Sequence, residues 1–278
     1  MKKFSVFIIA AVAALSFVSC QKNDRLPNDS EGQEIVLNVG DSFEVDTKAT
    51  AITTVPSTLY WGASTGTSTE SVKWTTASAS VSSSKINTGK YQTATATAYN
   101  YYVANQTFTV AGDMTVANNN TDIVAGRTAS SSSTTPSVTL NHIFARTGSL
   151  TCNAQSGYTI SGVSWKIYGS SSDIQGTAGT YNMKSQTWTA ASTKLTSETA
   201  ITSTSDMYLI PGTYTIKVSY TLTKGDYSQS FTKTGTVSLT MGKVNNISCT
   251  AIGGGASEIV LSVSLTAWGS ENKNMTLS

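Results

Sequence analysis

The stretch of sequence that decides the fold is TYTIKVSYTLT, residues 213–223. Large apolar or aromatic side chains alternate strictly with polar ones along it. Pro211-Gly212 precedes the stretch and Lys224-Gly225-Asp226 follows it, and both sequences are typical of turns. Because successive side chains of a strand point to opposite faces, the alternation predicts a β-strand with one buried and one polar face. The predicted buried face consists of Tyr214, Ile216, Val218, Tyr220 and Leu222.

The same period of two recurs in both directions along the chain, whereas helical periodicity is nearly absent. Strands with one polar face are typical of antiparallel sheets packed on one side, so we predict an all-β fold of antiparallel β-sandwiches. A polar stretch, TASSSSTTP at residues 128–136, separates two strand-rich halves and predicts a domain boundary. Residues 64–84 and 169–179 are expected to form long, polar loops or loosely patterned edges. Further alternating sets are Tyr99, Tyr101 and Val103; Val163, Trp165 and Ile167; and Val237, Leu239 and Met241.

The composition excludes one class of partner. Only 12% of the 278 residues are charged, so Ser and Thr must supply most of the polar surface. The net charge is +2 and no basic cluster occurs, which argues against a nucleic acid partner.

The N-terminus has the pattern of an export signal. Lys2 and Lys3 precede a weakly polar to apolar run at residues 4–18, which is too short for a comfortable membrane span. The small residues before Cys20 indicate a lipoprotein signal peptide over residues 1–19, with Cys20 as the lipid attachment site. The alternative is ordinary cleavage near Ala13 or Ser16, which would leave Cys20 incidental.

Two further cysteines, Cys152 and Cys249, lie in predicted strands. A disulfide is chemically permitted in an exported chain. The preferred interpretation is that both are buried small apolar residues, because the sequence gives no distance between them.

The sequence gives no support for an enzyme. Its one histidine, His142, lies in a predicted strand, where a structural role is commoner than a catalytic or metal-binding one. No G-x-S-x-G, P-loop, H-E-x-x-H or C-x-x-C motif occurs, so we expect no catalytic residues, cofactor or metal. A surface module that binds carbohydrate or host protein is an alternative, for which the tryptophans are candidates, although core packing is their commoner use. They are Trp61, Trp74, Trp165, Trp188 and Trp268.

The order of several segments resembles the fimbrillin family, the pilin-like subunits of Bacteroidales type V fimbriae. These segments are AYNYYVAN (98–105), DIVAGR (122–127), VTLNHIFART (138–147), YLIPGTYTIKVSYTL (208–222) and GKVNNIS (242–248). The resemblance implies two tandem transthyretin-like sandwich domains at residues 49–135 and 136–278. It also implies a fibre assembled by strand exchange. In that scheme a protease specific for Arg or Lys removes an N-terminal plug strand, and a C-terminal strand of another subunit replaces it.

In this scheme the departing and the arriving strand must fit the same place in a sheet. Two segments of the chain meet this requirement. Residues 34–39 read EIVLNV, and residues 258–263 read EIVLSV. Both alternate, so each would present an apolar row to a partner. The alternative is that both are ordinary strands, which would even pair with each other in one subunit. The apolar rows are Ile35, Leu37 and Val39 in the plug, and Ile259, Leu261, Val263, Leu265 and Ala267 in a donor strand at about 258–278.

Lys48-Ala49 is the expected processing site, at the end of a pro-segment spanning residues 20–48. The family more often has Arg there, and the alternative is that Lys48 is a solvated loop charge. Gly253-Gly254-Gly255 would let the donor strand swing to another subunit, although a hairpin turn also explains it.

The expected function is therefore a fimbrial structural subunit whose lipoprotein precursor is held at the outer membrane and whose mature form lies in a cell-surface fimbria. Its expected partners are other copies of itself or related fimbrial subunits, with host or bacterial surface ligands as further candidates. The alternative is a monomeric, lipid-anchored adhesin or carbohydrate-binding module.

Overall fold

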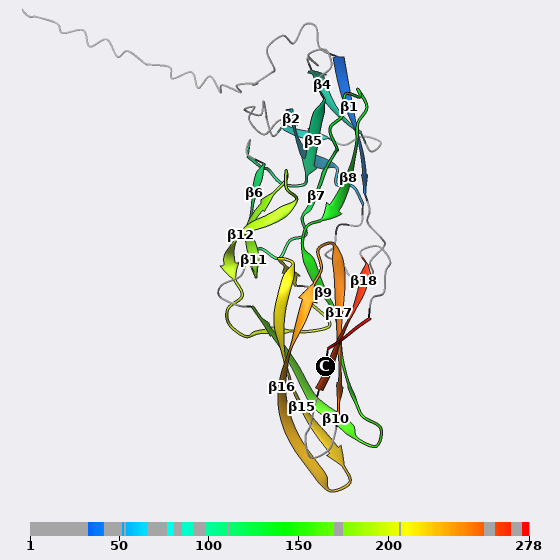
Figure 1. Cartoon of the computed structure of the whole chain (residues 1–278), viewed down its shortest axis with the longest axis vertical. Coiled ribbons are helices and arrows are strands. Elements are labelled where there is room, and N and C mark those ends of the chain that lie inside the picture. The colour runs from blue at the N-terminus through cyan, green and yellow to red at the C-terminus, as the bar shows by residue number, and fades with distance from the viewer. Residues whose placement is uncertain are drawn as a thin grey trace, which may run out of the picture.

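The computed structural model describes residues 33–41, 52, 54–65, 77–80, 85–91, 98–109, 112–169, 175–205, 207–252, 259–267 and 274–277. All regular structure in these residues is β, which confirms the predicted all-β class. No helix in the described part of the chain has the length and apolarity needed to cross a membrane. The seven-stranded sheet, a three-stranded sheet and a sandwich of two further sheets follow one another along the long axis of an elongated molecule (Figure 1).

The seven-stranded sheet lies at one end of the molecule and has the order β3-β2-β5-β7-β8-β1-β4. All neighbours are antiparallel except β1 and β8, which run parallel. The strands are β1 (Gln33–Asp41), β2 (Thr58–Thr65), β3 (Ala77–Ser80), β4 (Lys85–Tyr91), β5 (Tyr99–Ala104), β7 (Val124–Arg127) and β8 (Ser137–His142).

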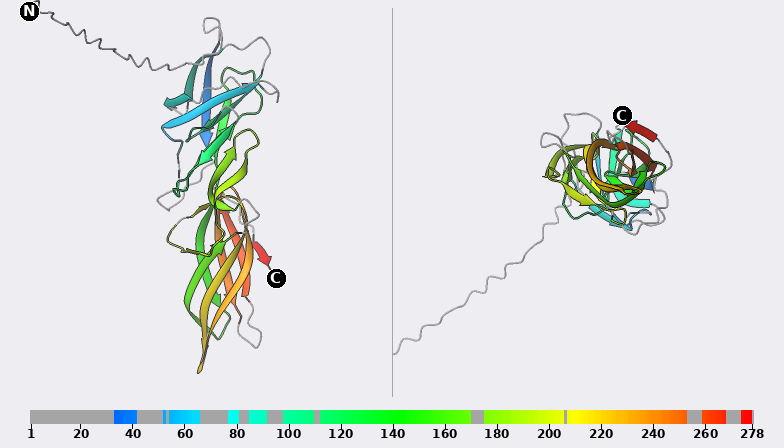
Figure 2. Two further views of the ribbon diagram at one scale, coloured as in Figure 1. Left: turned by 90° about the vertical axis from the view of Figure 1, so that its left-hand side faces the viewer. Right: turned by 90° about the horizontal axis from the view of Figure 1, so that it is seen from below.

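A four-stranded and a five-stranded sheet build the other end of the molecule, with the β15–β16 hairpin at its tip (Figure 2). The first has the order β13-β10-β15-β16, and comprises β10 (Thr159–Tyr168), β13 (Thr199–Ile201), β15 (Gly212–Lys224) and β16 (Tyr227–Leu239). The second has the order β14-β9-β17-β18-β19, and comprises β9 (Ala145–Ala154), β14 (Tyr208–Leu209), β17 (Lys243–Ala251), β18 (Ile259–Ala267) and β19 (Asn274–Leu277).

The stretch at residues 213–223 lies in β15, between β10 and β16. Its five predicted core side chains are all buried, with at most 2% of their surface exposed. They pack in one cluster with residues of the five-stranded sheet, including Ile247 and Cys249. A sandwich is therefore formed as the alternation predicted, since both sheets turn their apolar faces inward.

Two residues of the predicted alternating sets are exposed, and a third, Tyr99, is only partly buried. Val163 is 37% exposed because β10 contains a β-bulge between Ser161 and Ser164, with Gly162 in a left-handed conformation. Met241 is 38% exposed because it lies in the turn after the end of β16.

A three-stranded sheet of order β12-β11-β6 connects the two halves of the chain. The cluster beneath it combines Phe108 and Met114 from the N-terminal half with Phe144 and Trp188 from the C-terminal half, so the halves share a continuous apolar core. Its strands are β6 (Asp113–Val116), β11 (Gly176–Asn182) and β12 (Thr187–Lys194).

The start of β11 falls within residues 169–179, where we expected a polar loop or a loosely patterned edge, and β11 is instead the central strand of its sheet. Gly176 and Gly179 lie there because a Cβ on either would collide with the backbone carbonyl of Thr193 or Ala190 across the strand pair. The expected domain boundary between residues 135 and 136 precedes β8, yet β8 pairs with β7 and β1 in the seven-stranded sheet. The chain passes to the far sandwich after β8.

The preferred interpretation of the cysteines was wrong. Cys152 of β9 and Cys249 of β17 form a disulfide, with their Cα atoms 4.6 Å apart. They lie directly opposite each other because β9 and β17 are neighbouring parallel strands. The sequence could not provide this distance, since the two residues are 97 positions apart.

Candidate functional site

The candidate site is the place of β1 in the seven-stranded sheet, which we call the β1 position. It lies between β4, which pairs antiparallel with β1, and β8, which pairs parallel with it. The Val36 and Asn38 amides donate hydrogen bonds of 2.9 Å to the carbonyls of Thr134 and Pro136, just before β8. β1 is thus an interior strand that is hydrogen-bonded along both edges.

The side chains of β1 contribute to the core. Leu37 is fully buried and Val39 is 1% exposed. Both belong to the cluster that contains Val138 and Leu140 of β8. The predicted plug residue Ile35 lies in β1, but its side chain is outside the described residues. Removing β1 would therefore uncover apolar side chains and leave β4 and β8 with open edges.

The second of the two matching segments lies in a different sheet. β18 pairs antiparallel with β17 and with β19. The hypothesis that the two segments pair with each other within one subunit is therefore wrong. The predicted donor residues occupy the strand, but their side chains lie outside the described residues; these are Ile259, Leu261, Val263, Leu265 and Ala267.

The predicted lipidation and processing sites, Cys20 and Lys48-Ala49, also lie outside the described residues. Ile52, shortly after Lys48, lies within them. Its amide donates a hydrogen bond of 2.9 Å to Asp122 Oδ2. Ile52 also packs against the cluster beneath β1.

Asp122 is a buried group that the sequence did not single out. Asp122 is 1% exposed and His142 is 3% exposed. The Asp122 Oδ1 atom lies 3.0 Å from His142 Nδ1. Asp122 therefore joins the chain after the predicted cleavage site to the end of β8. The only sequence signal for it was its place at the start of the quoted DIVAGR segment, which carries no indication of a partner.

The described tryptophans are core residues. Trp61, Trp165 and Trp188 are 5%, 8% and 9% exposed. The Trp188 Nε1 group donates a hydrogen bond of 2.9 Å to the Ile143 carbonyl, and its ring centroid lies 4.8 Å from that of Phe144. Trp74 and Trp268 lie outside the described residues. The rings of Trp61, Trp165 and Trp188 therefore pack in the core, which disfavours the alternative that they stack on carbohydrate.

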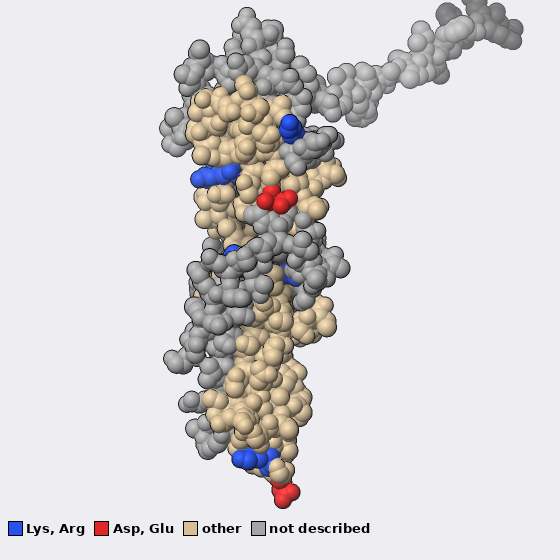
Figure 3. Space-filling view, turned by 90° about the vertical axis from the view of Figure 1, so that its right-hand side faces the viewer, with Lys and Arg blue, Asp and Glu red and all other residues tan. Residues whose placement is uncertain are grey.

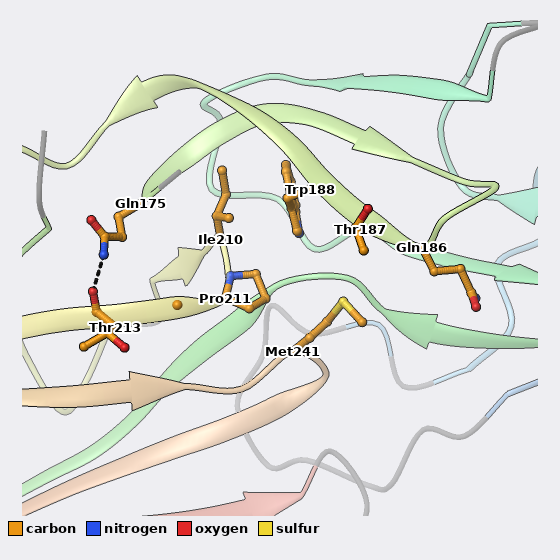
Figure 4. Close-up of a pocket in the computed structure, with 9 residues that line it drawn as sticks. Gln175, Gln186, Thr187, Trp188, Ile210, Pro211, Thr213 and Met241 are labelled. Carbon is orange, nitrogen blue, oxygen red and sulfur yellow. Dashed lines mark hydrogen bonds between the residues drawn. The ribbon is translucent and has the colours of Figure 1, made fainter. Parts of the chain in front are cut away.

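A pocket of about 450 Å³ lies beside Trp188 (Figure 4). Gln175 closes one end by donating through Nε2 to the Thr213 carbonyl. The lining has no carboxylate, imidazole, thiol, lysine or arginine, so the hydroxyls of Thr187 and Thr213 have no base among the lining residues to activate them. The remaining lining residues are Gln186, Ile210, Pro211, Gly212 and Met241.

Charged side chains are few and scattered on the face in Figure 3, in keeping with the low charge content. Among the described residues, no group of three or more His, Cys, Asp or Glu side chains is placed to hold a metal ion.

No family model matches the chain, and no curated protein matches it either. Solved structures match at low sequence identity. Fimbrilin from Porphyromonas gingivalis W83 is 11% identical, with a TM-score of 0.47 over 86% of this chain and 98% of that chain. A "putative cell adhesion protein" from Bacteroides eggerthii is 15% identical, with a TM-score of 0.44 over 87% and 98%. Another protein of that description, from Parabacteroides distasonis ATCC 8503, is 11% identical, with a TM-score of 0.53 over 86% and 97%. At this identity the similarity concerns architecture, so the chain shares its fold with the Parabacteroides distasonis protein.

Proposed function

We propose that the chain is a structural subunit of a cell-surface fimbria, exported as a lipoprotein through Cys20 and polymerised by exchange of β-strands. The observation that carries the proposal is the β1 position. An interior strand of sequence EIVLNV fills it, and the chain contains the closely matching sequence EIVLSV at residues 258–263, in β18 and the residue before it. The partner is another copy of the chain or a related fimbrial subunit.

The chain contains one suitable place to separate β1 from the rest of its sheet. β1 ends at Asp41, and the next described residue, Ile52, is held by Asp122. Lys48 is the only basic residue between Asp41 and Ile52. A protease specific for basic residues would therefore cut after Lys48, release β1 together with the lipid, and leave Ile52 attached to its sheet.

Loss of β1 would be costly unless another strand replaced it. Leu37 and Val39 each contribute about 1.5–3 kcal/mol of apolar burial, and the open edges of β4 and β8 would add unpaired backbone groups. An incoming strand with the same alternation restores both the apolar burial and the backbone hydrogen bonds, which is the physical basis of strand addition. Its register is strict, because a slip of one residue turns the apolar row to solvent.

The donor strand must also leave its own sheet. β18 pairs with β17 over nine residue pairs, from Ile259 opposite Ala251 to Ala267 opposite Lys243. Pairing with β4 and β8 of a neighbouring subunit would replace these interactions. The exchange therefore conserves strand pairing, and small differences between the plug and the donor decide its direction.

The processing step is tested with Lys48→Ala and with Lys48→Arg as the matched control. N-terminal sequencing of surface-exposed material from the parent and from Lys48→Arg should give Ala49 as the first residue, and Lys48→Ala should remain uncut. Cleavage of Lys48→Ala at the same peptide bond would contradict the proposed specificity.

The donor step is tested by deleting residues 258–278 and by the single change Leu261→Asp, which leaves chain length unchanged. We expect both variants to be exported and folded by circular dichroism, but to form no fibres in electron micrographs. Intact fibres from both would overturn the proposal. A monomeric lipid-anchored adhesin, the alternative, predicts that Cys20 stays lipidated and that neither variant changes the oligomeric state.

A further inference from the structure

This inference rests on the proposed strand replacement, and it concerns which of the two strands binds the β1 position more tightly. Aligning the two hexapeptides places Leu261 at the site of Leu37 and Val263 at the site of Val39. These pairs are identical, so they give neither strand an advantage. From Glu34 to Asp41, where β1 ends, the strands differ at three positions, which are Asn38 against Ser262, Gly40 against Ser264, and Asp41 against Leu265.

The Gly40 site accepts the incoming residue without rearrangement. Gly40 is exposed, and a Cβ built there meets no atom within 4 Å. Ser264 therefore fits at this site in open space. This difference is neutral, because the open site accepts either residue.

The Asp41 site favours the incoming strand. Asp41 follows Leu37 and Val39 at intervals of two, so it belongs to the same face of β1 as these buried residues. Its partner across the parallel pair is Leu140, which is fully buried. Asp41 itself is exposed, as a carboxylate at the margin of an apolar cluster must be to keep its hydration. Leu265 would instead extend the apolar row over this margin.

The Asn38 site favours the plug. Asn38 Nδ2 donates a hydrogen bond of 3.1 Å to the Thr135 carbonyl. The shorter Ser262 side chain would not reach this acceptor. The bond is exposed and joins neutral groups, so it is worth roughly a twofold to tenfold change in an equilibrium.

We propose that Leu265 of the incoming subunit decides the direction of exchange by taking the place of Asp41 opposite Leu140, while the Asn38 hydrogen bond retards release of the plug. If the site of Asp41 covers about half of the Leu265 side chain, the apolar burial favours the incoming strand by about tenfold. Position 41 of the precursor thus keeps the plug weaker than the strand that replaces it, and Asn38 keeps it from leaving early.

The test uses the full chain after processing and a fluorescent peptide of residues 257–269. Retention of the peptide is measured by gel filtration, and release of the β1 segment by mass spectrometry. We expect the Leu265→Asp peptide to bind about tenfold more weakly and the Ser262→Asn peptide about threefold more tightly. The matched control is Ser264→Asp, which adds the same charge at the open Gly40 site and should change binding less than about twofold.

Equal loss of binding for Leu265→Asp and Ser264→Asp would overturn the inference, because charge rather than position would then explain both. Failure of the unchanged peptide to bind at all would instead refute the proposed strand replacement. The reciprocal change in the chain, Asp41→Leu, should slow release of β1 by about tenfold. An unchanged release rate in a folded Asp41→Leu variant would also contradict the inference.

Discussion

Replacing Cys152 and Cys249 with alanine measures what the disulfide contributes to the sandwich that carries β18. The bond joins β9 to β17, and its two cysteines are 97 residues apart in sequence. In the chain-entropy model, closing a loop of about 100 residues in the unfolded chain is worth about 4.7 kcal/mol. Alanine preserves most of the packing at Cys249, which is 1% exposed. We therefore expect the double variant to lose about 4–5 kcal/mol of unfolding free energy.

The assay is urea unfolding followed by tryptophan fluorescence. With a denaturant dependence of about 3 kcal/mol per molar urea, the loss lowers the midpoint by roughly 1.5 M. The unchanged protein under reducing conditions is the control, and it should unfold at the midpoint of the variant. A variant whose midpoint lies within about 0.3 M of the oxidised protein would refute the loop-closure argument. The difference should persist when residues 258–278 are deleted, because the bond does not involve β18.

Three further predictions concern the seven-stranded sheet and the core. Leu37→Ala should lower the unfolding free energy of the uncut chain by about 2–5 kcal/mol, since Leu37 is fully buried; equal thermal midpoints would contradict this. Asp122→Ala should lower the unfolding free energy by about 1–3 kcal/mol, because it removes the buried carboxylate that faces His142 Nδ1. Amide exchange near β8 should accelerate, and unchanged exchange would contradict the view that Asp122 joins the segment at Ile52 to β8. Burial raises the pKa values of Tyr101 and Tyr181 to about 12. The phenols of the unfolded chain ionise near pH 10, while those of the folded chain stay neutral. The unfolding free energy should therefore fall between about pH 10 and 12, by about 1.4 kcal/mol per pH unit for each tyrosine, and replacing either tyrosine with Phe should flatten this slope.

The local pattern of the sequence predicted the strands well where the backbone stays regular. In β15, every second residue is buried as the alternation requires, because the side-chain direction of a strand is fixed by its own backbone. The prediction failed at Val163, where the bulge of β10 changes which face a residue occupies. It also failed at Gly176 and Gly179, whose turn-like composition reflects close backbone approach within a strand pair.

The sequence by itself determined the all-β class, the buried face of β15 and the match between residues 34–39 and 258–263. These features depend on local alternation or on direct comparison of residues. Only the tertiary structure decided that β1 lies between β4 and β8, that Cys152 faces Cys249, and that Asp122 holds Ile52. Alternation states which face of a strand is buried but not which strand is its neighbour. The partners in these contacts lie far apart in the chain, so only the packing of the sheets brings them together.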